Sequence, residues 1–226
     1  MAGKHAVSVW LALLALLFAG TLQAQDTAAT VLSLQGQVSA VSAAGLTRQL
    51  EQGSALYQGD RVDTGDDAAV SMRFTDNTRF DLAENSSMSV DNYAHQDNAE
   101  QSSFTASIFK GAFRFVSGLI AQRRSRAMGV RTPVATIGIR GTNVAGEVDA
   151  DSARIMLLEP DDQRPTAIEV SNAFGSVVVD EPGYGTEVPD ANSPPSPPRR
   201  MQLRTIQNLM RTLQSVGRIR TPPRIR

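Results

Sequence analysis

The stretch AVSMRFTDNTRFDL, residues 69–82, decides the fold class of this chain of 226 residues. Apolar side chains occupy positions 70, 72 and 74, and the alternation resumes at positions 80 and 82. A period of two places such side chains on one face of a β-strand. Two such runs around a short polar turn are typical of a hairpin, so we predict one that turns at Asp76 and Asn77.

The same pattern extends outward over most of the chain. It recurs in VLSLQGQVSAV and SSMSVDNY, and we expect the last strands in ARIMLLE, TAIEVSN and GSVVVDEPG. SFTASIFKGAFRFVSGLI contains Gly111 and Gly118, and we expect two buried strands there rather than a helix. Short strands at this spacing predict a mainly β fold, a compact antiparallel sandwich or barrel-like domain. A short β-solenoid is the alternative.

The first residues predict a targeting signal. A basic start, the apolar run AVSVWLALLALLFAG and small residues up to Ala24 are typical of a secretory signal peptide over residues 1–24. The run is shorter than the roughly 20 residues that span a bilayer, although a retained anchor is the alternative. We therefore expect a periplasmic β domain over residues 25–189, with a core at 35–147 and further strands at 153–188. The chain contains no Cys, so no disulfide framework is expected.

The charge is divided unevenly between the body and the C-terminal end. Residues 25–190 hold 13 Lys and Arg against 23 Asp and Glu, whereas residues 191–226 hold eight Arg and no acid. We expect a Pro-rich linker at 190–199, a basic amphipathic helix at 200–217 and a basic tail at 218–226. Its candidate interaction residues are Arg204, Ile206, Leu209, Met210, Arg211, Leu213 and Arg218. The helix could bind an acidic partner, an anionic membrane surface or its own acidic body.

The sequence contains few residues of the types that usually carry out catalysis. Beyond the predicted signal peptide the sequence has a single His, at position 95, and no Cys, G-x-S-x-G or HExxH motif. We therefore expect no enzyme, no catalytic residue, no cofactor and no metal site. DTGDD and DADS offer oxygen ligands for calcium, but acidic turns need no metal to explain them. The acidic body and the secreted address argue against nucleic-acid binding.

The stretch VRTPVATIGIRGTN, residues 130–143, resembles a phosphate loop only superficially. It lacks the Lys of a P-loop and the following helix of a dinucleotide fold. We interpret it as a strand in which Thr132-Pro133 imposes an extended backbone and in which Gly138 and Gly141 permit a bend or a close approach. Arg140 is its lone charge, and we expect it to pair with a carboxylate of the body.

Taken in order, these motifs resemble the FecR domain family. The resemblance rests on GQV, LEQGSALYQGDRVDTGDDAAVSMRFTDNTRFDLAENSSMSV, KGAFRFVSG and TPVATIGIRGTN. Its motif positions, which we expect to be mainly structural, are Gly36, Gly53, Gly59, Asp60, Thr64, Gly65, Asp76, Thr132, Pro133, Gly138, Arg140, Gly141 and Thr142. Asn77 stands where the family often has Gly, and Asn tolerates the left-handed backbone of such a turn.

The resemblance implies a periplasmic, non-enzymatic sensing or docking role. Named regulators of the family carry a cytoplasmic anti-sigma segment, cross the inner membrane once and receive a signal from an outer-membrane transducer. Here the predicted signal peptide leads almost directly into the domain, so we expect a stand-alone form that lacks the anti-sigma segment. We expect an envelope protein as partner. The alternative is a carbohydrate- or envelope-polymer-binding domain that stacks sugars on Tyr57, Tyr93 and Tyr184; a hydrolase based on Asp60 and Asp76 is the third reading.

Overall fold

The mainly β expectation is confirmed. The computed structural model describes residues 26–96, 99–124, 127–141, 143–159, 166–202, 204, 206–208 and 211. Its helical elements are the short η1 (Ala99–Gln101) and α2 (Leu119–Arg123), together with helical backbone among the described residues from position 204 to 211. The strands are β1 (Thr27–Gln35), β2 (Val38–Val41), β3 (Thr47–Gln49), β4 (Ala55–Tyr57), β5 (Arg61–Thr64), β6 (Ala69–Phe74), β7 (Arg79–Leu82), β8 (Ser87–Ala94), β9 (Ser103–Val116), β10 (Met128–Arg131), β11 (Thr136–Arg140), β12 (Asn143–Val148), β13 (Ala153–Leu158), β14 (Ala167–Asn172), β15 (Gly175–Val179), β16 (Tyr184–Val188) and β17 (Arg199–Arg200).

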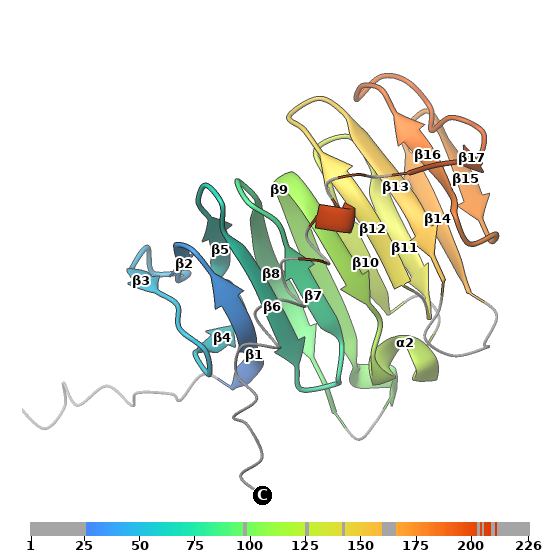
Figure 1. Ribbon diagram of the computed structural model, residues 1–226. Helices are drawn as coiled ribbons and strands as arrows, with labels where there is room; N and C mark the ends of the chain where they lie inside the picture. The colour runs from blue at the N-terminus through green and yellow to red at the C-terminus, as the bar shows by residue number, and fades with distance from the viewer. Residues whose placement is uncertain are drawn as a thin grey trace, which may run out of the picture.

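The strands form two layers. Sheet A has the order β4-β1-β6-β7-β9-β12-β13-β16-β17, and sheet B has the order β3-β2-β5-β8-β9-β10-β11-β14-β15. The chain alternates between the layers while it advances along the body, from blue to orange in Figure 1. The network is open rather than closed into a barrel, and it is mixed because β9 and β10 are parallel.

β9 is the strand that joins the layers. Its first half pairs with β8 and β10 in sheet B, and residues 111–116 pair with β12 in sheet A. The change of sheet falls at Gly111, whose φ is +95° and whose added Cβ would lie 2.1 Å from the Ser86 hydroxyl oxygen. Only glycine fits both conditions. The two strands expected in this stretch are therefore one strand with two halves, followed by α2.

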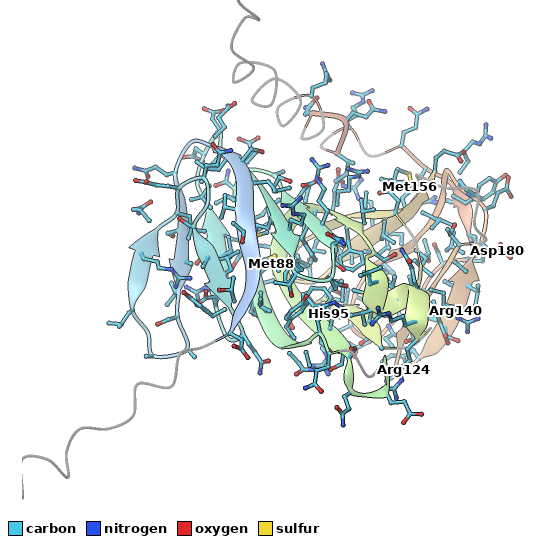
Figure 2. The ribbon with its side chains drawn as sticks, turned by 90° about the horizontal axis from the view of Figure 1, so that it is seen from below. Met88, His95, Arg124, Arg140, Met156 and Asp180 are labelled. Carbon is cyan, nitrogen blue, oxygen red and sulfur yellow. The ribbon has the colours of Figure 1, made fainter. Side chains whose placement is uncertain are left out.

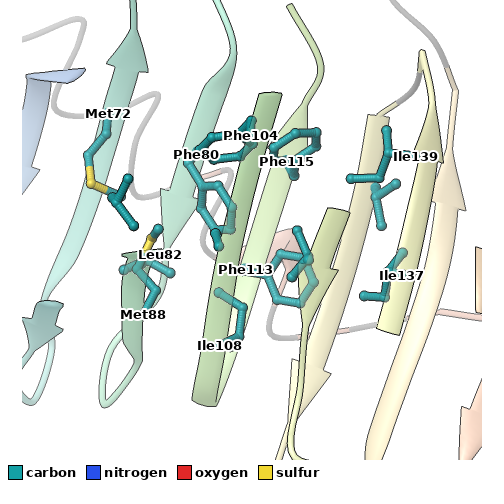
Figure 3. Close-up of a cluster of buried hydrophobic side chains, with 14 of the residues drawn as sticks. Met72, Phe80, Leu82, Met88, Phe104, Ile108, Phe113, Phe115, Ile137 and Ile139 are labelled. Carbon is teal, nitrogen blue, oxygen red and sulfur yellow. The ribbon is translucent and has the colours of Figure 1, made fainter. Parts of the chain in front are cut away.

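The core lies between the layers and is rich in phenylalanine. Phe80, Phe113 and Phe115 project from sheet A, Phe104 projects from sheet B, and all four are fully buried (Figure 3). The Phe104 and Phe115 rings stack across the layers with centroids 5.8 Å apart. Burying one such side chain contributes about 1.5–3 kcal/mol, so this cluster is a principal source of the stability of the sandwich.

The Pro-rich stretch lies along the body. Residues 190–193 form bends and turns, and Ser196 then donates its N–H to the Glu187 carbonyl at 2.9 Å and accepts the Thr186 hydroxyl at 2.7 Å on its own carbonyl. β17 then pairs with β16 through Arg199 and Arg200. The stretch is therefore a hydrogen-bonded continuation of sheet A rather than a free spacer. No helix within the described residues has the length and apolarity to cross a membrane.

Candidate interaction surfaces

Asp60 holds a turn rather than a reaction centre. Its buried carboxylate accepts the Tyr57 backbone N–H at 2.8 Å and a guanidinium N–H of Arg48 at 3.2 Å. The hydrogen bond to Asp60 raises the pKa of Arg48, and the Arg48 guanidinium lies 5.6 Å from the Tyr57 ring centroid. These contacts close the β4–β5 turn. The carboxylate is therefore already used by the fold.

Asp76 performs a similar task at the β6–β7 turn. The hairpin is confirmed, with Val70 opposite Leu82, and Asn77 adopts the left-handed φ of 68°. One Asp76 oxygen accepts the Thr78 N–H at 3.0 Å, and the other accepts the Thr78 hydroxyl at 2.8 Å and the Ile120 N–H at 3.3 Å. Because the last donor belongs to α2, Asp76 caps a helix more than 40 residues away in sequence, where Gly118 offers no side chain to do so.

Tyr93 completes this cluster. Its hydroxyl accepts the Asp76 N–H at 2.9 Å and lies 2.8 Å from the Thr75 hydroxyl oxygen. Its ring packs on Phe74 and Phe104, with centroids 5.2 and 5.8 Å away. Burial raises the pKa of Tyr93 to about 12. The three tyrosines expected to bind sugar therefore form no common platform: Tyr57 lies under Arg48, Tyr93 packs on the core, and Tyr184 lies 6.0 Å from the Arg200 guanidinium toward the other end of sheet A.

Several of the remaining motif positions also serve turns. Thr64 donates its hydroxyl to the Ala83 carbonyl at 2.6 Å and accepts the Ser86 N–H. Thr132 accepts the Ala135 N–H at 3.0 Å, which closes a β10–β11 hairpin with Pro133 in its turn. The expected single extended strand is therefore a hairpin. Positive φ angles occur at Gly36, Gly53, Gly59 and Gly141, whereas Gly65 and Gly138 lack them. Thr142 lies outside the described residues.

Arg140 pairs with a carboxylate, as expected. Its guanidinium lies 3.9 Å from the Glu169 carboxylate on the neighbouring strand β14. The expected alternation is also confirmed along β11, since Ile137 and Ile139 are buried and Thr136 and Arg140 are exposed. Arg140 therefore projects from the outer face of sheet B.

Part of the outer face of sheet A is covered. Small residues and one methionine form a buried cluster on it: Ala69, Ala83, Ala112, Ala145 and Met156. Ile206 packs against this cluster with only 3% of its surface exposed, and Met201 joins it. Of the candidate helix residues, Arg204 and Arg211 are exposed, while Leu209, Met210, Leu213 and Arg218 lie outside the described residues. The start of the basic segment therefore docks on its own domain.

A polar network lies on the same outer face of sheet A. Asp81 is fully buried there, 3.3 Å from Arg79 Nε and 3.5 Å from Arg114 Nη1. Arg114 in turn donates its Nε–H to the Asn143 amide oxygen at 3.0 Å. Alternation along β7 and β9 could have placed these groups on one face, but their burial depends on a cover that the local pattern does not reveal.

The outer face of sheet B is open. Along the first half of β9 and along β10, β11, β14 and β15, every outward position among the described residues is partly or fully exposed. Phe109 and Val178 are exposed apolar side chains on it. Figure 2 shows Arg140 and Met156 on opposite sides of the two layers. Arg131 and Gly129, which no sequence motif singled out, lie on the open face beside Arg140.

Within the described residues, no three His, Asp or Glu side chains converge in a metal-binding arrangement. Among the described residues, one surface depression lies on sheet B between β9, β10, β11 and β14. The described part of the chain is thus a two-layer β domain with one outer face partly covered by its own C-terminal segment and the other available for contact.

Part of the chain is similar to a known protein family. Residues 60–161 match the family described as FecR protein. The match begins within the resemblance drawn from the sequence and extends beyond its end, through β13. No curated protein matches the chain significantly.

Two solved structures are similar in part. A crystal structure from Parabacteroides distasonis, described as "a putative anti-sigma factor", is 12% identical with a TM-score of 0.49. That match covers 66% of this chain and 64% of the other, so this chain spans less than two thirds of that protein's length. A structure described as "Cell surface anchoring domain" is 27% identical with a TM-score of 0.30, and covers 32% of this chain and 99% of its own.

Proposed function

We propose that this protein is a non-enzymatic interaction and signal-sensing module of the cell envelope, placed in the periplasm by its first 24 residues. One observation carries the proposal. The acidic motif residues that could have acted in catalysis are buried and hydrogen-bonded within the fold, while one broad face of the sandwich is open. Asp60 and Asp76 are buried and hydrogen-bonded to backbone groups, so neither carboxylate is free to act on a substrate.

The FecR domain supports the signalling part of the proposal. Named regulators of the FecR family receive their signal by protein contact outside the cytoplasm. A protein partner also fits the open face of sheet B, where polar positions surround exposed apolar side chains such as Val178. A sugar-binding function has weaker support, because Tyr57, Tyr93 and Tyr184 form no stacking platform.

The C-terminal segment has a role within the domain in this proposal. Ile206 is seated on sheet A, so the segment shields an apolar cluster that would otherwise face solvent. Self-docking therefore accounts for the apolar side chain of Ile206 without a membrane. Its exposed arginines, Arg204 and Arg211, remain on the outside and contribute to solubility and to encounter with acidic partners.

The experiment is crosslinking in living cells followed by reconstitution. A tagged full chain, expressed with and without residues 1–24, is fractionated and treated with formaldehyde. We expect the intact chain to reach the periplasm and to form a discrete protein adduct that is reproduced with the purified partner. Cytoplasmic retention of the intact chain would contradict the address. Co-sedimentation with purified peptidoglycan, without any reproducible protein adduct, would contradict the interaction role.

A further inference from the structure

A pair of glycines interrupts the outer face of sheet B. Gly129 on β10 lies directly opposite Gly138 on β11, and the row continues to Thr105 on one side and Glu169 on the other. Neither glycine has a positive φ. An added Cβ would meet its nearest neighbour at 3.4 Å from Gly129 and at 3.8 Å from Gly138, which are ordinary contact distances.

The fold itself therefore does not require glycine at these two positions. A glycine inside a strand costs about 0.5–1 kcal/mol relative to alanine, and it gives the sheet no side chain to pack. What the pair provides is space. A depression of about 250 Å³ lies over it, bordered by Thr105, Thr136, Arg131, Arg140 and Glu169. Interior-strand glycines of this kind allow the close approach of another backbone.

The charges around the depression indicate which chemical groups a binding partner would present. Arg131 and Arg140 are 61% and 46% exposed, and their ion pairs with Asp91 and Glu169 each span 3.9 Å, longer than a hydrogen bond. Exposed pairs of this length contribute little to stability, so a carboxylate from elsewhere can replace the internal one at small cost. A guanidinium binds a carboxylate through two parallel N–H donors, and the hydroxyl groups of Thr105 and Thr136 add neutral donors and acceptors.

We propose that this depression, the glycine trough, binds an extended acidic segment of a partner protein. The partner backbone approaches Gly129 and Gly138, and its carboxylates bind Arg131 and Arg140. Glu169 competes for Arg140 in the unbound protein. The inference rests on the proposed interaction function and assigns it a place and a partner chemistry.

The test uses the full chain and a fluorescent octapeptide of alternating Gly and Glu, with the Gly-Gln octapeptide as the neutral probe. We expect Arg140→Gln and Gly138→Val to weaken binding on the order of tenfold, which corresponds to about 1.4 kcal/mol. Glu169→Gln is expected to strengthen binding, because Arg140 loses its internal competitor. Arg61→Gln is the matched control, since Arg61 is an exposed, ion-paired arginine on β5 of the same sheet.

Three results overturn the inference: no binding of the acidic peptide, equal loss in Arg61→Gln and Arg140→Gln, or unchanged binding in Gly138→Val. Gly138→Val introduces a β-favouring side chain on an exposed face, and circular dichroism checks that it remains folded. A protein adduct in cells that is unaffected by Arg140→Gln rejects the trough but leaves the interaction function standing. Absence of any adduct rejects the function itself.

Discussion

Replacing Asp76 with asparagine tests whether this motif residue serves the fold. The two side chains have nearly the same shape, so the change alters hydrogen bonding rather than packing. One carboxylate oxygen faces the Thr78 N–H at 3.0 Å and the other faces the Ile120 N–H at 3.3 Å. Asparagine has only one acceptor oxygen. In either orientation its NH₂ group therefore points at a backbone donor.

The expected cost follows from these contacts. A buried donor left without a partner costs about 1–3 kcal/mol, and a hydrogen bond to a charged group contributes about 1.5–3 kcal/mol. We therefore expect Asp76→Asn to lower the free energy of unfolding by about 2–4 kcal/mol. With a denaturant slope near 3 kcal/mol per molar urea, the unfolding midpoint falls by about 1 M.

Urea unfolding followed by circular dichroism is the assay, and Asp66→Asn is the control because Asp66 is exposed in a turn. The control is expected to stay within about 0.5 kcal/mol of the wild type. An Asp76→Asn variant as stable as the control would refute the capping role. Asp76 would then have to be reconsidered as a residue retained for chemistry or binding.

Three further predictions concern other parts of the structure. Gly118→Ala places a Cβ 2.3 Å from a carbonyl oxygen of the β6–β7 turn and is expected to destabilise by about 1–3 kcal/mol, whereas Gly138→Ala should be neutral or stabilise by up to about 1 kcal/mol in thermal unfolding. Ile206→Asp should detach the C-terminal segment and speed its cleavage by trypsin, while Gln207→Asp, at an exposed neighbour, should not. Because burial raises the pKa of Tyr93 to about 12 from the ordinary 10, its stabilising effect is present below pH 10 and lost as pH rises toward 12. As pH rises from 10 to 12, the free energy of unfolding of the Tyr93→Phe variant should therefore fall less than that of the wild type.

The sequence was informative where structure is local. The period of two located the hairpin of β6 and β7, and Asn77 tolerates the left-handed turn that glycine usually occupies. The alternation in β11 gave the correct exposed and buried sides. The pairing of Arg140 with a carboxylate was also foreseen, because an isolated charge beside an acidic body has few other partners.

The remainder depended on contacts distant in sequence. β9 was expected as two strands, since no local pattern shows that one strand can pass between sheets at Gly111. The capping of α2 by Asp76 spans more than 40 residues. Sequence rules for helix capping consider only residues next to the helix, so they could not predict this contact. The Pro-rich stretch was read from composition as a spacer, yet its hydrogen bonds to β16 depend on where that strand lies. The glycine trough also depends on such a contact, because Gly129 and Gly138 meet only across a hairpin.

The most direct test of the account is site-specific photocrosslinking in living cells, with a photoreactive residue at Val178 on the open face of sheet B. The account predicts a discrete adduct with an envelope protein from this position, and a much weaker one from Leu46, which is more exposed but lies in the distant β2–β3 turn. An adduct from Leu46 with none from Val178 would contradict the assignment of the open face. No protein adduct from either position would contradict the interaction function.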